Sequence, residues 1–162
     1  MADFLKIPPP ALSEAVKNFK GVRRRQEIIG EKRGILIVDD FAHHPTAIES
    51  TLAGMRGHVG ENRIWVLLEP RSNTMRMGIH KQQLAMSLAG ADVICLYQPE
   101  DMDWDLNQVA ADLGDRATVY TDVDAIVETL RQQLSPGDHI VVMSNGSFAG
   151  IHLKLENMLK LL

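Results

Sequence analysis

Short, mostly apolar segments recur along this chain, and amphipathic segments separate them. Runs of this length and character are typical of strands that helices cover on both faces. We expect strands at residues 35–38, 64–68, 93–97, 117–120 and 139–143. Because helical crossovers between parallel strands are right-handed, the alternation leaves few compact arrangements. It predicts an α/β fold, a Rossmann-like three-layer sandwich with a mostly parallel sheet.

Helical spacing of apolar residues is clearest from Val123 to Leu134, where they recur at i, i+3, i+4, i+7 and i+11. A short helix is expected at residues 11–19. Three further helices are expected around Ile48, Leu52 and Met55, around Leu84 and Leu88, and around Ile151, Leu155, Met158 and Leu162. Ile28-Ile29 and the turn residues 30–34 precede the first central strand, which predicts an N-terminal hairpin or antiparallel edge strand.

The length of 162 residues predicts one domain, which we place at residues 11–162. Residues 1–10 end in Pro8-Pro9-Pro10 and are expected to be an extended linker. A net charge of -4 without a long basic run argues against nucleic-acid and membrane-surface partners. The single cysteine, Cys95, lies in an apolar run and is expected to be a buried thiol in a reducing cytoplasm. No segment has the length of a membrane span or the order of a signal peptide.

The loop after the first central strand places two carboxylates and two imidazoles within residues 39–44. Polar residues at the carboxyl end of a strand usually contact a ligand, which favours a functional role. Capping of the following helix by His44 or Asp40 is the alternative. A phosphoesterase metal site would need a further Asp/His cluster at other strand ends, and a phospho-receiver domain would need a phosphorylatable Asp and a Lys. The sequence offers none of these at the expected positions.

Two other loops also carry possible ligand groups. In residues 67–76, Arg71 and Arg76 can each hold a carboxylate through a bidentate fork, although a solvated loop is an equal alternative. Residues 143–151 form a glycine-containing turn before a helix, whose backbone N–H groups can cradle an anion. The sequence Gly-x-x-x-x-Gly-Lys-Ser/Thr of a P-loop does not occur. Three adjacent arginines at 23–25 are expected to be solvated, with phosphate contact as the minor alternative.

Four segments together resemble the C-terminal domain of the Mur ligases, and the resemblance runs from about Ala11 to the end. They are Gly21-Val22-Arg23-Arg24-Arg25, Asp39-Asp40-Phe41-Ala42-His43-His44-Pro45-Thr46, Leu68-Glu69-Pro70-Arg71-Ser72-Asn73-Thr74, and residues 143–152. The histidine loop is shared with the alanine-adding branch of the family. The loops at 68–74 and 143–148 resemble the tripeptide-adding branch of peptidoglycan recycling, which we therefore favour over the alanine-adding branch.

The resemblance implies an enzyme that uses ATP and magnesium to join UDP-N-acetylmuramate to L-alanyl-γ-D-glutamyl-meso-diaminopimelate through an acyl phosphate. The family's N-terminal and central domains, the latter with the P-loop and magnesium ligands, have no counterpart in this sequence. The resemblance therefore implies partners in cis and an inactive isolated domain. A free-standing, non-catalytic module that binds a small anion is the alternative of another class.

The resemblance also assigns roles to particular residues. Arg25 matches a nucleotide-contacting arginine and Asp40 a ribose-contacting aspartate, and His43 is expected beside the phosphates as the candidate catalytic residue. A wall of the peptide pocket is implied for Arg71, Ser72, Asn73, Thr74, Asn145, Gly146 and Ser147. No metal ligand is assigned within this chain.

Overall fold

A six-stranded sheet forms the centre of the molecule in a computed structural model that describes residues 5–19 and 21–162. Its strands are β1 (Glu27–Lys32), β2 (Ile35–Asp40), β3 (Ile64–Leu68), β4 (Val93–Tyr97), β5 (Ala117–Tyr120) and β6 (His139–Met143). Their order is β1-β2-β6-β3-β4-β5; β1 pairs antiparallel with β2, and the other neighbours are parallel. The expected mostly parallel sheet with an N-terminal hairpin is confirmed.

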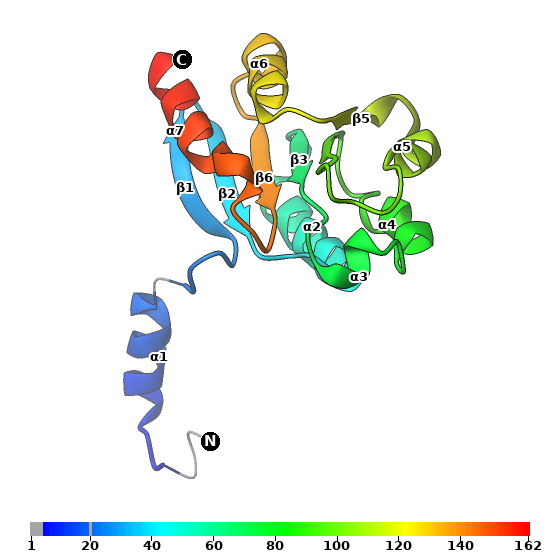
Figure 1. The fold of residues 1–162 in the computed structure, drawn as a ribbon. Coiled ribbons are helices and arrows are strands. Elements are labelled where there is room, and N and C mark those ends of the chain that lie inside the picture. Colours follow the sequence, from blue (N-terminus) through cyan, green and yellow to red (C-terminus); the bar gives the residue numbers. More distant parts are fainter. Residues whose placement is uncertain (1–4, 20) are drawn as a thin grey trace.

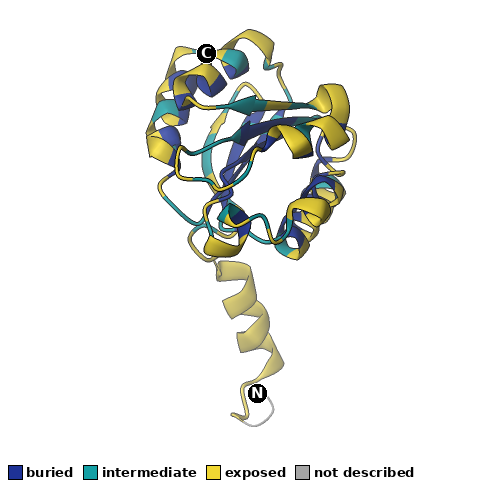
Figure 2. Cartoon of the chain, turned by 45° about the vertical axis from the view of Figure 1, so that its right-hand side comes forward, coloured by how far each residue is buried: buried dark blue, intermediate teal, exposed yellow. Residues whose placement is uncertain are grey.

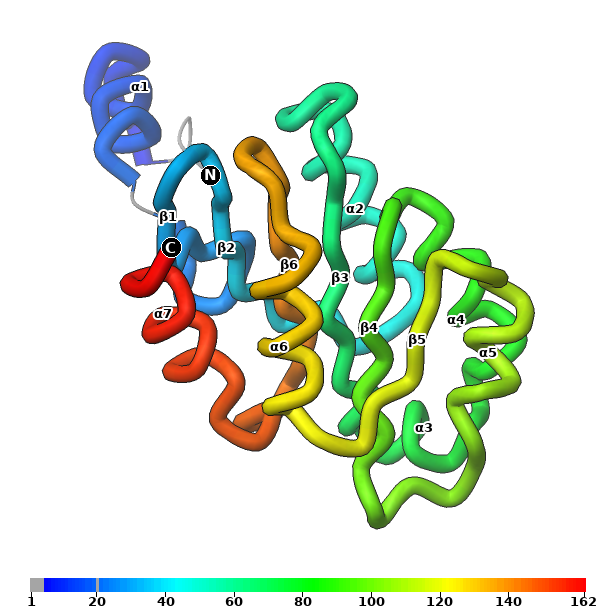
Figure 3. The backbone as a smooth tube through the Cα atoms, turned by 90° about the horizontal axis from the view of Figure 1, so that it is seen from above, coloured from blue at the N-terminus to red at the C-terminus, as the bar shows by residue number. Residues whose placement is uncertain are grey.

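Helices cover both faces of this sheet (Figures 1 and 3). On one face pack α2 (Pro45–Val59), α4 (Lys81–Ser87) and α5 (Asn107–Leu113); on the other pack α6 (Val123–Gln133) and α7 (Ile151–Leu161). This is the three-layer sandwich that the alternating pattern predicted. None of the helices in residues 5–19 and 21–162 has the length and apolar character to cross a membrane.

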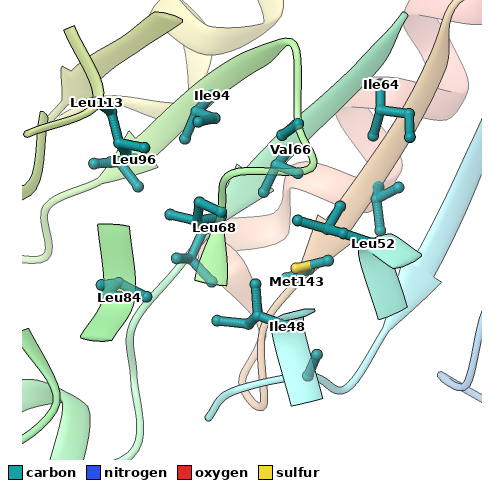
Figure 4. Close-up of a cluster of buried hydrophobic side chains, with 14 of the residues drawn as sticks. Ile48, Leu52, Ile64, Val66, Leu68, Leu84, Ile94, Leu96, Leu113 and Met143 are labelled. Atoms are coloured by element: carbon teal, nitrogen blue, oxygen red, sulfur yellow. The ribbon is translucent and has the colours of Figure 1, made fainter. Parts of the chain in front are cut away.

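Alternation along the central strands divides the core into two parts. Val66 and Leu68 face α2 and α4, where Figure 4 shows them beside Leu52 and Leu84. Trp65 and Leu67, which alternate with them along β3, lie with the α6 and α7 side chains on the opposite face. Because successive side chains of a strand point to opposite faces, a fully buried strand must be apolar at every position. All five residues of β3 are buried.

Two short helices were not predicted. One is α3 (Asn73–Arg76), which lies inside the segment expected to be a loop. The other is α5, which buries only Val109 and Leu113 among its seven residues. A helix of one or two turns presents too few apolar positions for its period to be recognised. The β2 strand also continues two residues beyond its expected end, through Asp39 and Asp40.

The N-terminal helix α1 (Pro9–Asn18) stands apart from the sheet and has no buried residue (Figures 1 and 2). The helix expected at 11–19 is present, but it begins at Pro9, so the extended backbone expected for all three prolines holds only at Pro8. Proline suits the first helical turn because the N–H it lacks would have no partner there. Residues 1–4 of the expected linker lie outside the described residues, and a domain boundary after residue 10 remains a prediction.

Cys95 lies in the middle of β4 and is 1% exposed. Burial raises the pKa of its thiol to about 12 because the apolar surroundings disfavour the thiolate. The expectation of a buried thiol is confirmed.

Candidate functional site

The three polar loops identified in the sequence leave the sheet side by side. In the sheet, Met143 at the end of β6 is paired with both Asp40 at the end of β2 and Leu68 at the end of β3. Beyond these ends, the Ser144 N–H donates to the Asp40 carbonyl at 3.3 Å and the Glu69 N–H to the Met143 carbonyl at 3.0 Å. The carboxyl ends of parallel strands are where ligands bind in open α/β sheets. The fold therefore gathers the candidate residues at one edge.

Asp40 is buried, and its carboxylate is largely occupied by the chain itself. One oxygen accepts the Ala42 N–H at 2.7 Å and the Thr51 hydroxyl at 3.4 Å, and the other accepts the Gln26 N–H at 2.9 Å. The side chain is 4% exposed. Since a carboxylate offers about four acceptor positions, roughly one remains for a ligand. Asp40 thus ties the loop, α2 and the preceding segment together.

The two loop histidines differ in their contacts. His44 is the N-cap of α2, where its Nδ1 accepts the Thr46 N–H at 3.3 Å, as the capping alternative predicted. Its ring also lies against that of His80, with 4.4 Å between centroids. His43 is half-buried, and its Nδ1 lies 2.9 Å from the Phe41 carbonyl, which orients the ring and leaves Nε2 for another partner.

Asp39 points to the opposite face of the sheet from Asp40 and forms an ion-pair cluster that was not predicted. Its carboxylate lies 3.1 Å from the Arg24 Nε and 3.0 Å from the His152 Nε2. Burial alone would raise the pKa of Asp39, but the His152 hydrogen bond and the charges of His152 and Arg24 outweigh it. The pKa of Asp39 therefore lies below its usual value.

Arg24 joins the segment before β1 to the turn after β6. Its Nη2 donates to the carbonyls of Ser144 at 2.7 Å and Gly146 at 3.1 Å, in addition to the Asp39 contact. Its backbone is left-handed, with φ of 56°, which an arginine adopts only where the surrounding contacts hold it. Arg25, the residue singled out in the sequence, is exposed, and its guanidinium lies 5.4 Å from the Phe41 ring centroid.

The loop after β3 and the turn after β6 are joined by a buried carboxylate. Glu69 is 1% exposed; the Ser144 hydroxyl donates to its Oε2 at 2.5 Å, and the Arg71 Nη1 lies 3.5 Å from its Oε1. The Ser144 hydroxyl oxygen also accepts the Gly146 N–H at 2.8 Å. Arg71, whose side chain is 53% exposed, lies directly across Gly146. Arg71 and Gly146, expected on one wall, are in contact.

The other expected peptide-binding residues lie around this link. Ser72 and Thr74 face each other with 3.4 Å between their hydroxyl oxygens, at the start of α3. Asn145 has a buried Oδ1 with no hydrogen-bond partner in the described part of the chain, which is costly unless a ligand or water supplies a donor. The exposed residues of this group are Asn73, Thr74 and Ser147. Arg76, by contrast, is paired with Asp101 at 3.1 Å.

The turn after β6 has an unusual backbone. Phe148, Ala149 and Gly150 have φ of 45°, 44° and 75°, three successive residues in the left-handed region that most side chains avoid. Phe148 is fully buried, with its ring 5.5 Å from that of Tyr97. Packing of this ring therefore holds the turn in a conformation that its backbone alone would not favour.

Within residues 5–19 and 21–162, no group of three or more His, Cys, Asp or Glu side chains is placed to hold a metal ion.

Comparison with known proteins places the chain in a family. Residues 24–146 match the family described as Mur ligase, glutamate ligase domain. The chain is 49% identical over 150 residues to the Escherichia coli (strain K12) UDP-N-acetylmuramate–L-alanyl-γ-D-glutamyl-meso-2,6-diaminoheptandioate ligase, covering 92% of the chain and 33% of that protein. It is 34% identical over 152 residues to a UDP-N-acetylmuramate–L-alanine ligase from Desulfitobacterium hafniense (strain Y51), covering 86% of the chain and 33% of that protein.

Two solved structures are similar in both fold and sequence. A murein peptide ligase from Psychrobacter arcticus superposes with a TM-score of 0.78 at 41% identity, covering 94% of this chain and 33% of that one. The second is a domain from Haemophilus ducreyi, described as part of a UDP-N-acetylmuramate:L-alanyl-γ-D-glutamyl-diaminopimelate ligase. It superposes with a TM-score of 0.71 at 44% identity, covering 83% of this chain and 99% of that one.

The chain therefore belongs to the Mur ligase family and contains its glutamate ligase domain. It spans about a third of the length of the curated relatives it matches.

Proposed function

We propose that this chain is the C-terminal domain of a murein peptide ligase, which joins UDP-N-acetylmuramate to L-alanyl-γ-D-glutamyl-meso-diaminopimelate in the cytoplasm. The observation that carries the proposal is the contact between the Arg71 loop and the turn at 144–147. In sequence, those two segments resemble the tripeptide-adding branch rather than the alanine-adding branch. The 49% identity to a relative named for this reaction supports the same assignment.

On the peptide side, the proposed wall matches an anionic, amide-rich ligand. Arg71 has a half-exposed guanidinium that can hold a carboxylate through two parallel hydrogen bonds. The Oδ1 of Asn145, which has no hydrogen-bond partner among residues 5–19 and 21–162, can accept a peptide N–H or an amine proton. Additional donors and acceptors are offered by Ser72, Asn73, Thr74, Gly146 and Ser147.

On the nucleotide side, the proposed contacts are Arg25, Asp40 and His43. Arg25 is exposed and permanently charged, so it can reach a phosphate without a change of protonation. Asp40 can accept one ribose hydroxyl through its remaining acceptor position, while its other bonds keep the carboxylate in place. His43 has its Nε2 available for a phosphate oxygen, because Nδ1 is directed at the Phe41 carbonyl.

ATP, bound with magnesium mainly by a central domain, would supply the phosphoryl group that makes the muramate carboxylate an electrophile. The role of this chain is to hold the peptide amine in line with that carboxylate and to cover the nucleotide. With no P-loop sequence of its own, the chain requires N-terminal and central domains in cis. We therefore expect the isolated domain to be catalytically inactive.

The assignment can be tested by amide NMR of this chain, titrated with the tripeptide and separately with L-alanine. We expect tripeptide-dependent shifts clustered at residues 71–74 and 144–147, and none with L-alanine. Shifts of the same residues with L-alanine alone would favour the alanine-adding branch, to which the chain is also similar. A tripeptide response located elsewhere, for example over α6, would contradict the proposed site.

A further inference from the structure

Glu69 is a buried carboxylate that has no assigned part in the proposed binding of peptide or nucleotide. Its side chain is 2% exposed at the end of a strand whose residues are all buried. Burying a carboxylate is unfavourable unless hydrogen bonds and an opposite charge compensate. The backbone alone already connects this position to β6, through the Glu69 N–H and the Met143 carbonyl. A role in strand pairing therefore does not explain why the side chain is acidic.

The two partners of this carboxylate belong to the two sides of the proposed peptide wall. Ser144, at the end of β6, donates its hydroxyl to Glu69 and accepts the Gly146 N–H, which fixes the turn. Arg71, in the loop after β3, forms the ion pair at 3.5 Å. Glu69 thus contacts one residue on each side of the peptide wall, and both contacts use its carboxylate oxygens.

Gly146 gives a second, independent observation. Its φ is not in the left-handed region, so its backbone would accept other residues. A Cβ built at this position would, however, overlap the Cδ of Arg71 and lie 3.2 Å from the Glu69 Oε2. The glycine therefore leaves room for the arginine to lie across the turn, rather than serving the turn itself.

The guanidinium held in this way is not saturated. Within the described residues, Arg71 makes a single side-chain hydrogen bond, and that bond is long at 3.5 Å. An arginine carries five N–H donors in a planar fork. The carboxylate of Glu69 orients the group by charge and leaves most of its donors for a second anion.

We propose that Glu69 is a positioning residue that holds Arg71 across Gly146, so that the guanidinium faces a carboxylate of the peptide. The inference rests on the proposed peptide-ligase function and adds the groups that determine its preference for an anionic peptide. Glu69 itself does not touch the peptide. It acts through the orientation of Arg71 and through Ser144.

The test compares Glu69→Gln, Gly146→Ala and the matched control Glu100→Gln, which removes an exposed carboxylate from the loop after β4. Gly146→Ala leaves the buried carboxylate intact, so it remains informative if Glu69→Gln fails to fold. The first measurement needs no ligand: the NMR signal of the Arg71 Nε–H, assigned with Arg71→Lys. We expect Glu69→Gln and Gly146→Ala to move this signal towards that of a free arginine, and Glu100→Gln to leave it unchanged.

The second measurement is the ratio of Kd values for the tripeptide and for the same peptide with its carboxylates converted to carboxamides. We expect the parent chain to prefer the carboxylate form by about tenfold to a hundredfold, as for one charge-assisted bond. Both substitutions should reduce this preference towards one. In an Arg71→Ala background, neither should reduce it further.

Different failures separate the two proposals. If Glu69→Gln weakens both peptides equally, or leaves the Arg71 signal unchanged, Glu69 is only a structural residue and the inference is wrong. If the parent chain binds neither peptide while Glu69→Gln still moves the Arg71 signal, the proposed function fails but the orientation of Arg71 by Glu69 stands.

Discussion

The loop after β2 and the loop after β3 leave the same edge of the sheet, and both are rich in polar side chains, but they use them differently. After β2, Asp40 binds two backbone N–H groups and a hydroxyl, and His44 caps α2. After β3, Glu69 is buried, while Asn73 and Thr74 are exposed and Arg71 is half-exposed. In the first loop, the polar side chains hydrogen-bond mainly to backbone groups of the chain. In the second, most of them are exposed to solvent.

The difference shows that a concentration of polar residues at a strand end is not sufficient to identify ligand contacts. The number of hydrogen-bonding positions that the fold leaves open is the better criterion. By that criterion the Arg71 loop and Asn145 are strong candidates. Asp40 has a mainly structural role with little capacity for a ligand.

The largest effect is expected at Asp40. Replacing it with alanine leaves the buried Ala42 N–H and the part-buried Gln26 N–H without their acceptor, and a buried, unpaired donor costs about 1–3 kcal/mol. We expect Asp40→Ala to lower the free energy of unfolding by about 3 kcal/mol, measured by urea denaturation. Asp112→Asn, an exposed site on α5, is the control and should change it little.

If Asp40→Ala unfolds at the same urea concentration as the parent chain, the carboxylate is not structural. The contrast between the two loops would then disappear, and nucleotide binding would be the main reason for an acidic residue there.

The next effect compares two neighbours in the arginine run. Arg24→Ala removes three side-chain bonds and leaves buried Asp39 with His152 alone, so we expect a loss of about 2 kcal/mol in unfolding free energy. Arg25→Ala should cost less than about 0.5 kcal/mol, because the side chain is exposed. Equal losses in thermal or urea unfolding would mean that both arginines anchor the segment.

The layers and the central strands could be predicted because they depend on local patterns. Continuous apolar runs define β3 and β4, and the i, i+3, i+4 spacing defines α6. The three loops could be predicted to lie side by side because parallel strands end at a common edge of the sheet. These inferences need no knowledge of individual side-chain contacts.

The partners within the site could not be predicted. Asp39 meets His152 across 113 positions and Glu69 meets Ser144 across 75, and no sequence spacing encodes such pairs. The run of three arginines gave no means of telling that Arg24 anchors the chain while Arg25 remains exposed. Glu69 offered a weak signal of a buried ion pair, because an acidic residue directly follows a strand that is apolar at every position.

A smaller effect is expected at His44. Removing an N-cap acceptor usually costs about 0.5–2 kcal/mol, and the 3.3 Å bond from the Thr46 N–H places His44→Ala near the lower end. His44→Asn should restore stability, since asparagine is among the best N-cap residues. Urea denaturation of both variants is the measurement. A loss that asparagine fails to restore would point instead to the contact with His80.

The smallest effect is expected from acid titration of Asp39, because its burial opposes the stabilising influence of His152 and Arg24. The pKa of Asp39 is lowered on folding from a usual value of 3.8, so its contribution is complete above that pH and is lost as the pH falls through the lower folded pKa. We expect unfolding free energies of the parent chain and Asp39→Asn to converge as the pH is lowered below 3.8. If the difference instead persists unchanged into that acidic range, the protonated, neutral carboxyl group of Asp39 supports the fold as well as the carboxylate does. The Arg24–Asp39–His152 cluster would then hold the chain by geometry and not by charge.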